Sequence, residues 1–406
     1  PGLEFIAQAK AGIGLTGVRL LTFRFSTTTT YILEMGSGYI RFFTDGAPLG
    51  APYEISSPYS ATDVFDVQAA QLNDVVYLVH PDYPVQKLSR ISELNWTLAE
   101  VSFDTAPFLD ENLTATTITP SGTTGSITLT ASAALFNNGG IYPLEGHVGS
   151  YWQISHLRQA ASTERNIAAA AAWVTATVYA VTDTVTHAGN RYRCLVAHTS
   201  GVFATDLAAN KWVLTTAYQI TAPLRILGEW NLRTYGTWQA TIYVERSTDG
   251  GTTWERIRKF SGKEDRNVDV SGTQDSEAQL RAVVEDWVLE SPASATTPRV
   301  VLEAVDAYIN GLVKITAVAS STSATATVIN DLESTAATKT WSEGAWSGVR
   351  GYPRTVTFYE QRLCFAGTDY QPQTVWGSVT NDYQNFTIGT EDTDAFARSE
   401  EHTSEL

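Results

Sequence analysis

Residues Gly351–Phe386 read GYPRTVTFYEQRLCFAGTDYQPQTVWGSVTNDYQNF, and this stretch decides the fold class. Two apolar runs separated by turn-forming residues predict a strand, a turn and a second strand. A fainter copy lies nearer the N-terminus, where Asp74–Leu88 (DVVYLVHPDYPVQKL) aligns with Gln361–Val375 (QRLCFAGTDYQPQTV). The aligned pairs are Val76 with Leu363, Leu78 with Phe365, Asp82 with Asp369, Tyr83 with Tyr370, Gln86 with Gln373 and Leu88 with Val375. A unit used twice predicts one blade type repeated about an axis, as in a β-propeller.

Composition supports an all-β chain. Only 17% of the residues are charged, while 29 glycines and 11 Trp, 18 Tyr and 15 Phe supply turns and aromatic surface. These proportions are typical of strands joined by many turns. A length of 406 residues allows two to four domains with their own cores. The two cysteines, Cys194 and Cys364, give no disulfide framework, and no apolar run approaches the roughly 20 residues that span a bilayer.

The net charge argues against electrostatic binding to nucleic acid. The formal charge is −16, and no run of basic residues occurs. Binding to phosphates needs clustered Lys and Arg, so electrostatic DNA binding is not expected. Two interpretations of the acidity stay open: an acidic wall that lets DNA slide past without adhering, or charge that only keeps the protein soluble.

Strand patterns divide the chain into segments. We expect an irregular, partial β-propeller that is interrupted by a β-sandwich-like domain and a small aromatic β-module. Residues 157–172 read as a linker or short helix, and Ser276–Trp287 is predicted to be a strand although its composition also suits a helix. The predicted segments are 1–110 (propeller-type meander), 111–172 (inserted β-domain, first part), 173–215 (aromatic module), 216–335 (inserted domain, second part) and 336–397 (return to a propeller blade).

The last residues have a different character. Arg398–Leu406 (RSEEHTSEL) resembles the translation of a sequencing adapter joined to a reading frame. Such segments are set aside in fold reasoning. We therefore expect an internal fragment of a longer protein, whose natural sequence stops after about Ala397.

Three long segments resemble the nozzle protein of short-tailed bacteriophages, the tail tubular protein B family. They are Leu20–Gly46, Tyr53–Arg90 and Lys339–Phe386, and RSTDGGTTW (Arg246–Trp254) and GLVKIT (Gly311–Thr316) add to the likeness. The resemblance implies a structural virion component of the tail, assembled in the host cytoplasm, whose six copies form the tube wall for genome ejection. It implies contact with a tail adaptor ring and tail fibres, DNA that passes the lumen without specific binding, no cofactor and no catalytic residue.

One short motif invites an enzymatic interpretation. Arg246–Trp254 contains an Asp box, the SxDxGxTW pattern of sialidases and other propellers, at Ser247, Asp249, Gly251, Thr253 and Trp254. We expect a structural hairpin tip, in which Asp249 accepts bonds from turn N–H groups, glycines take positive φ and Trp254 tucks under the loop. A sialidase also needs an arginine cluster, a Tyr nucleophile, an acid and several boxes, whereas this sequence has one box, so we favour the structural turn. A glycan-binding or glycan-hydrolysing propeller is the alternative.

The segment Trp173–Trp212 is rich in aromatic residues and resembles small chitin-binding-type modules. The aromatic residues that we single out as possible glycan contacts are Trp173, Tyr179, Tyr192 and Trp212. Exposed rings can stack on sugar rings, which makes a surface glycan a possible partner. In a module of about 40 residues the same rings are also needed as the core, and we favour that interpretation.

The remaining reactive residues give no catalytic or metal site. Cys194 and His198 are four residues apart, which on a continuous strand places them about 13 Å apart at about 3.3 Å per residue. A metal would need two more ligands, and only His187 is near in the sequence. We therefore predict a protein that is not an enzyme and binds no metal.

Overall fold

A computed structural model describes residues 5–10, 17–139, 146–262, 267–288, 297–389 and 391–399. The chain divides into two compact units, which we call the stack unit (Pro1–His156 and Asn310–Leu406) and the insert unit (Leu157–Ile309). The predicted all-β class is confirmed. Within the described ranges the helices are only η1 (Asp63–Phe65) and α1 (Phe203–Ala208), and no helix there is long and apolar enough to cross a membrane.

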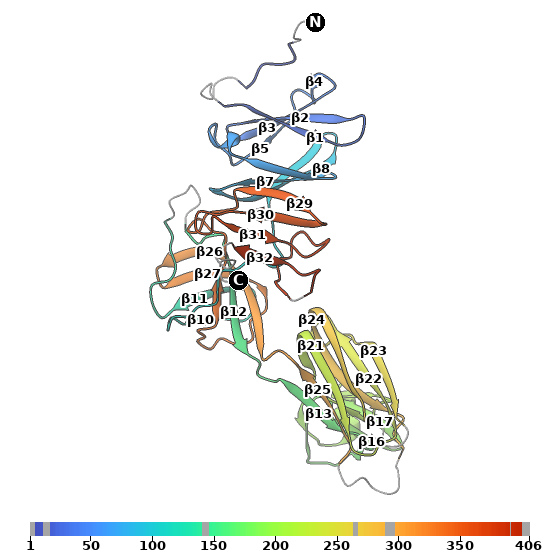
Figure 1. Cartoon of the computed structure of the whole chain (residues 1–406). Helices are drawn as coiled ribbons and strands as arrows, with labels where there is room; N and C mark the ends of the chain where they lie inside the picture. Colours follow the sequence, from blue (N-terminus) through green and yellow to red (C-terminus); the bar gives the residue numbers. More distant parts are fainter. Residues whose placement is uncertain are drawn as a thin grey trace. The chain divides into compact units, whose positions relative to one another are not determined.

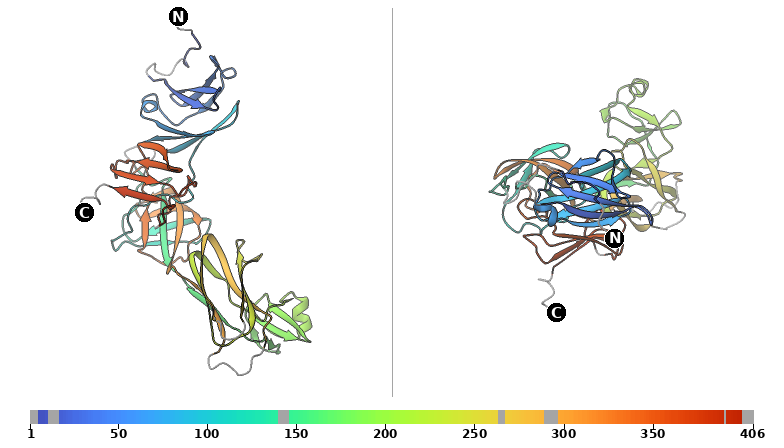
Figure 2. Two further views of the ribbon diagram at one scale, coloured as in Figure 1. Left: turned by 45° about the vertical axis from the view of Figure 1, so that its right-hand side comes forward. Right: turned by 90° about the horizontal axis from the view of Figure 1, so that it is seen from above.

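Antiparallel sheets lie face to face in the stack unit (Figures 1 and 2). The first consists of β1 (Arg19–Arg24), β2 (Thr30–Gly36), β3 (Tyr39–Thr44), β4 (Ala47–Pro48) and β5 (Glu54–Ser56). The second consists of β6 (Gln68–Leu72), β7 (Val75–His80), β8 (Tyr83–Ser92) and β9 (Asn95–Glu100). The third consists of β29 (Thr355–Tyr359), β30 (Arg362–Ala366), β31 (Thr374–Gly377) and β32 (Phe396–Ser399). The second and third sheets each have four strands, as the blades of a propeller do, whereas the first has five. The partial propeller stays a prediction.

The middle sheet is covered on both faces, which explains its nearly continuous apolar sequence. Leu78 and Leu88 pack into one core with the first sheet, whereas Tyr77 and Val79 pack into another core with the third. Every residue of β7 after Val75 is buried as a result. Strands buried on both faces read as apolar runs without alternation.

The predicted alignment of the two repeats is correct for their first strands, β7 and β30. It is wrong for their second strands, β8 and β31. Leu78 of β7 and Phe365 of β30 are both buried on the second strand of their sheets. The chain then reverses tightly between His80 and Tyr83, but it takes the longer loop 367–373 before β31. Leu88 therefore pairs with Val76 and is buried, while its aligned partner Val375 pairs with Ala366 and is 40% exposed.

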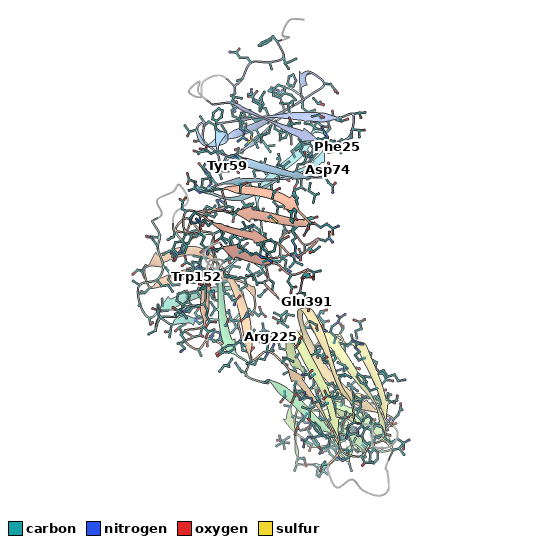
Figure 3. The ribbon with its side chains drawn as sticks, in the orientation of Figure 1. Phe25, Tyr59, Asp74, Trp152, Arg225 and Glu391 are labelled. Carbon is teal, nitrogen blue, oxygen red and sulfur yellow. The ribbon has the colours of Figure 1, made fainter. Side chains whose placement is uncertain are left out.

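A further sheet of the stack unit is built from both sides of the insertion. Its order is β10 (Ile118–Pro120), β11 (Ser126–Ala131), β27 (Ser323–Asn330), β26 (Tyr308–Ser320), β12 (Tyr151–Leu157) and β28 (Trp341–Glu343). Trp152 is fully buried in its core (Figure 3). Three strands from before the insert unit and three from after it make up this sheet. The chain leaves through β12 and returns through β26, and these two strands are neighbours.

The insert unit contains a twisted antiparallel sheet. Its order is β13 (Ser162–Asn166), β25 (Arg299–Ala304), β21 (Leu224–Tyr235), β24 (Asp269–Glu285), β22 (Ala240–Ser247) and β23 (Glu255–Gly262), and β20 (Gln219–Ile220) pairs with β24. The predicted strand at Ser276–Trp287 is confirmed by β24. The predicted linker or helix at 157–172 is wrong, because residues 162–166 alternate along β13 and pair with β25. The alternation of exposed and half-buried residues in β13 covers only five positions, which is too short to predict a strand from the sequence.

The ends of the chain are described only in part. Arg398 and Ser399 form the end of β32 and pair with Val375 and Thr374. The rest of the segment that resembles an adapter, residues 400–406, lies outside the described residues.

Candidate functional site

The aromatic segment folds as a small module within the insert unit. One sheet has the order β14 (Ala171–Ala172), β16 (Thr184–His187), β17 (Asn190–Cys194) and β19 (Trp212–Leu214). A second, two-stranded sheet pairs β15 (Val178–Tyr179) with β18 (His198–Thr199), and α1 follows. Asp206 of α1 accepts a bond from the Gly201 N–H at 2.9 Å, so its side chain holds the loop that leads into the helix.

One face of the four-stranded sheet forms the core of the module. Val185 lies opposite Tyr192 and Cys194 lies opposite Trp212, which places all four side chains on this face. Phe203 of α1 packs against Tyr192 and Trp212, with ring centroids 4.8 and 6.2 Å apart. A single short helix therefore covers the sheet.

Two of the four predicted glycan-contacting rings belong to this core. Tyr179 is 8% exposed and Trp212 is 3% exposed, and their ring centroids are 5.1 Å apart. The Tyr179 hydroxyl also accepts a bond from the Val174 N–H at 2.8 Å. Tyr179 and Trp212 are therefore core residues of the module and are not exposed for contact with a glycan.

The other two predicted rings remain partly accessible and are joined by a histidine. Trp173 and Tyr192 are half-buried, and so is His187. Trp173 contacts His187 edge to face at 5.7 Å, and His187 lies flat on Phe203 at 3.9 Å. We call Trp173, His187 and Tyr192 the aromatic rim, because they surround Phe203 without being buried with it.

Sequence reasoning missed both Phe203 and the role of His187. His187 was considered only as a weak metal ligand, but it lies two residues after Val185 on β16 and so shares its face. Phe203 is not among the four aromatic residues that the sequence analysis singled out. The period of two along the strand was the signal that could have found His187.

Cys194 and His198 are much closer than predicted. The Cys194 Sγ lies 3.8 Å from His198 Nδ1, whereas the sequence predicted a separation of about 13 Å. The chain leaves β17 after Cys194 and turns before β18, so the assumption of a continuous strand was wrong. Asp206 completes the group, since its Oδ2 lies 3.5 Å from His198 Nε2.

This Cys–His–Asp group is nevertheless poorly suited to nucleophilic chemistry. Cys194 is fully buried, and burial raises the pKa of its thiol, which keeps the thiolate scarce. His198 Nδ1 lies 2.7 Å from the Val196 carbonyl, which occupies the nitrogen that faces the sulfur. A bond from Lys211 lowers the pKa of Asp206 and joins this carboxylate to a surface cation. The group therefore packs the module.

The opposite face of the module sheet is tied to the larger sheet of the insert unit. Arg165 of β13 donates to Asp183 at 2.5 Å, and the Thr184 hydroxyl bonds to the Tyr218 carbonyl. The guanidinium of Arg191 lies 3.9 Å from the Tyr218 ring. These contacts fix the orientation of the module on the insert unit.

The Asp box forms the tip of the β22–β23 hairpin. Asp249 accepts bonds from the Thr253 N–H at 2.9 Å and from the Thr253 hydroxyl at 2.7 Å. Gly250 and Gly251 take φ of +70° and +92°, and the Trp254 indole donates to the Gly251 carbonyl at 2.9 Å. The bonds from Thr253 lower the pKa of Asp249 to about 2. This carboxylate is committed to the turn, which is the geometry that the motif predicts.

Arginines and carboxylates also converge on the outer face of the insert-unit sheet. Arg281 donates to Glu245 through Nε and Nη2 at 2.9 and 2.7 Å, and Arg256 donates to Glu285 at 2.6 Å. Arg281 also lies over the ring of Trp254, 3.9 Å from its centroid. Each guanidinium thus has a carboxylate partner, so the group is a paired ionic network on a sheet face.

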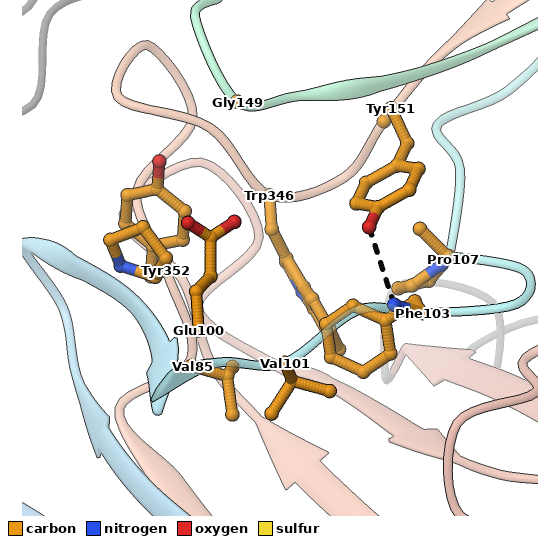
Figure 4. A pocket seen from close by; sticks show the side chains of 12 residues that line it. Val85, Glu100, Val101, Phe103, Pro107, Gly149, Tyr151, Trp346 and Tyr352 are labelled. Carbon is orange, nitrogen blue, oxygen red and sulfur yellow. Dashed lines mark hydrogen bonds between the residues drawn. The ribbon is translucent and has the colours of Figure 1, made fainter. Parts of the chain in front are cut away.

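One pocket of the stack unit, drawn in Figure 4, is too small for a sugar. Its volume is about 30 Å³, and its lining includes Glu100, Tyr151, Trp346 and Tyr352. A water molecule needs about 10–15 Å³ of such space, so the cavity is of the size of one or two waters. Among the described residues, no group of three or more His, Cys, Asp or Glu side chains could hold a metal ion.

Comparison with known proteins identifies one segment. Residues 172–206 match the model of carbohydrate-binding module family 5/12. No curated protein matches the chain. Among solved structures, a GH31 alpha-xylosidase from Xanthomonas citri aligns at 12% identity, covering 77% of this chain and 38% of that chain, with a TM-score of 0.13. A score this low carries no argument about fold. A part of the chain is thus similar to a carbohydrate-binding module.

Proposed function

We propose that the module of residues 173–215 binds a carbohydrate and that the remaining described chain is a non-enzymatic β-scaffold that carries it. The observation that carries this proposal is that the aromatic rim lies inside the segment that is similar to a carbohydrate-binding module. The segment that matches the carbohydrate-binding family, residues 172–206, contains the whole aromatic rim.

The rim offers the chemistry that a sugar ring needs. Sugars present C–H groups on their faces and hydroxyl groups around their edges, so they pack on aromatic rings that keep one side in solvent. Trp173, His187 and Tyr192 are half-buried, so they are the rings of the module that we propose for this contact. Asn190 is exposed and lies directly opposite His187 on β17, where its amide can bond a hydroxyl group. Binding here needs no cofactor.

Two groups that could suggest catalysis support a structural role instead. Asp249 is engaged by turn donors, and the Cys194 thiol is buried. We therefore propose that the chain recognises a glycan without cleaving it.

A binding assay on the whole protein tests the proposal. We expect the wild type to bind insoluble chitin or soluble chito-oligosaccharides, and Y192A and H187A to bind several-fold more weakly. V181A is the matched control, because Val181 is exposed and lies in the turn before β16, at the end of the strand away from His187. Wild-type protein that is retained on neither chitin nor cellulose would contradict the proposal, as would rim variants that bind as V181A does.

A second candidate role concerns the stack unit, and the resemblance to phage tail nozzle proteins motivates it. We propose that the stacked sheets are a structural wall of a virion tail, assembled as a homo-hexamer through which DNA passes. The face-to-face sheets with a fully covered middle sheet support a rigid wall. In this setting, the module would display its rim to glycans on a host surface.

Electron microscopy separates the two roles. Negative-stain images of the full-length protein should show six-fold rings if the nozzle role is correct. A monomer that binds chito-oligosaccharides would remove the nozzle role and leave the carbohydrate role intact, and rings that bind no glycan would do the reverse.

A further inference from the structure

The outer face of the first stack sheet carries a groove that the proposed function does not use. Its volume is about 320 Å³, and it lies between the N-terminal segment and strands β1–β3. Ligand sites usually have volumes of about 300–1,000 Å³. The side chains that line most of it are apolar, among them Ile6, Leu20, Ile32 and Phe43.

Two carboxylates line this groove: Asp45 is exposed, whereas Glu34 is buried. Glu34 is only 5% exposed, and it sits opposite Leu20 on β1 and Arg41 on β3, so it points to the same face as the apolar lining. Its Oε1 accepts a bond from the Tyr39 hydroxyl at 2.7 Å. Burial and this bond raise the pKa of Tyr39 to about 12, so the hydroxyl keeps its proton and remains a donor.

The backbone is adapted to hold this pair. Tyr39 lies opposite Gly36, and a Cβ on Gly36 would come within 2.4 Å of the Tyr39 ring. The ring therefore crosses β2 at the one position without a side chain, which is how its hydroxyl reaches Glu34. A larger residue at position 36 would push Tyr39 away from the carboxylate.

Within the described residues, Glu34 has no cationic partner. The two nearby cations are engaged elsewhere, since Lys10 and Arg41 both bond to Glu54, at 2.5 and 2.9 Å. A carboxylate removed from water without a cation is costly, and charge-assisted bonds to a ligand would offset that cost. The groove is thus complementary to an apolar group that ends in a positive charge.

We propose that this groove binds an arginine side chain of a partner protein, with apolar residues beside the arginine. Arginine suits the site because its guanidinium is weakly hydrated and its stem is apolar. A protein partner is favoured over a small free cation because apolar surface continues around the groove. Leu20 is 63% exposed and Phe5 is 79% exposed, and only a larger partner would cover both. The proposal rests on the stack unit and is independent of carbohydrate binding by the module.

Peptide binding to the full chain tests this proposal. The probes are acetylated five-residue peptides with a central arginine between leucine, valine or phenylalanine residues, each with a citrulline twin of nearly the same shape without the charge. We expect at least one arginine peptide to shift the NMR signals of Leu20 and Ile32 and to bind about tenfold more tightly than its twin. E34Q should weaken the arginine peptide about tenfold, whereas E93Q, which changes an exposed glutamate outside the groove, should change its affinity less than twofold.

Three results would overturn the proposal: citrulline twins that bind as tightly as the arginine peptides, an unchanged affinity in E34Q, or no binding by any peptide. The citrulline comparison uses wild-type protein, so it decides the role of charge even if E34Q folds poorly. n-Butylguanidinium tests the size of the partner. We expect it to bind at least tenfold more weakly than the best peptide, and equal affinity would refute a protein partner.

Discussion

The β6–β9 sheet of the stack unit and the module of residues 173–215 use their aromatic residues in different ways. In β6–β9 the rings of Tyr77, Tyr83 and Trp96 are all buried, because the sheet has another sheet on each face. In the module, a short helix covers one face, so Trp212 is buried while Trp173 stays half-exposed. An aromatic residue therefore indicates a binding role only when the structure shows that its ring is not buried by a neighbouring sheet or helix.

The largest predicted effect is the loss of stability when a buried tryptophan is replaced, and it should be confined to the unit that contains the tryptophan. W212A should destabilise the module by about 3–5 kcal/mol, the usual cost of deleting a buried tryptophan. Because the module core is small, we expect amide hydrogen exchange to lose protection over residues 173–215 while β6–β9 keeps it. W96A should affect the stack unit in the same way and spare the module. Loss of protection in both regions from either change would contradict two separate cores.

The repeated strands offer a matched pair with a smaller effect. L88A should cost about 2–5 kcal/mol in the free energy of unfolding, since Leu88 is fully buried between sheets. V375A should cost less than about 0.5 kcal/mol, because the aligned valine lies on the exposed face of β31. Denaturant titration of the two variants measures the difference. Equal costs would mean that the second strands of the two repeats are equivalent after all.

The stack unit also has a predicted dependence on pH. Burial raises the pKa of Glu343, but bonds from His147 at 3.0 Å and Arg350 at 2.6 Å outweigh it, so the pKa lies below its ordinary 4.5. Because the folded-state pKa is depressed, the stabilisation is complete above pH 4.5 and is lost as pH falls through the depressed value. We expect a slope of up to about 1.4 kcal/mol per pH unit in that range.

The matched variant for this test is E343Q, which removes the titrating group. It should lower stability at neutral pH and flatten the acid limb of the stability curve. An acid limb as steep as that of the wild type would show that other carboxylates cause the loss.

The smallest predicted effect concerns the rim. Y192A should weaken carbohydrate binding by about two- to tenfold, since one aromatic contact contributes about 0.5–1.5 kcal/mol. D249N should leave that affinity unchanged, because Asp249 serves the β22–β23 turn. Isothermal titration with a chito-oligosaccharide measures both. A stronger effect from D249N than from Y192A would move the site to the Asp box.

The sequence predicted those parts of the fold that depend on local patterns. The Asp-box turn, the β24 strand and the apolar run of β7 follow from residue type and spacing. The register of the second strand in each repeat could not be predicted in this way, because the length of the preceding loop sets which residue of β31 pairs with β30. Pairing register depends on such turns and is weakly encoded in a single strand.

Two of the four predicted glycan contacts belong to the aromatic rim. Trp173 and Tyr192 are partly accessible, whereas Tyr179 and Trp212 are buried. His187 was missed because its partner ring, Phe203, comes from a helix 16 positions further along the chain. Cys194 and His198 were placed too far apart because the sequence does not show where β17 ends. Contacts that depend on a chain reversal could not be read from spacing.

The indole N–H signals of Trp173 and Trp212 test the central claim most directly. The two signals can be assigned from W173F and W212F and followed by NMR while chitotriose is added to the whole protein. We predict that the Trp173 signal moves with saturation and that the Trp212 signal stays in place. A Trp212 signal that moves instead, or two signals that never move, would contradict a carbohydrate site at the rim.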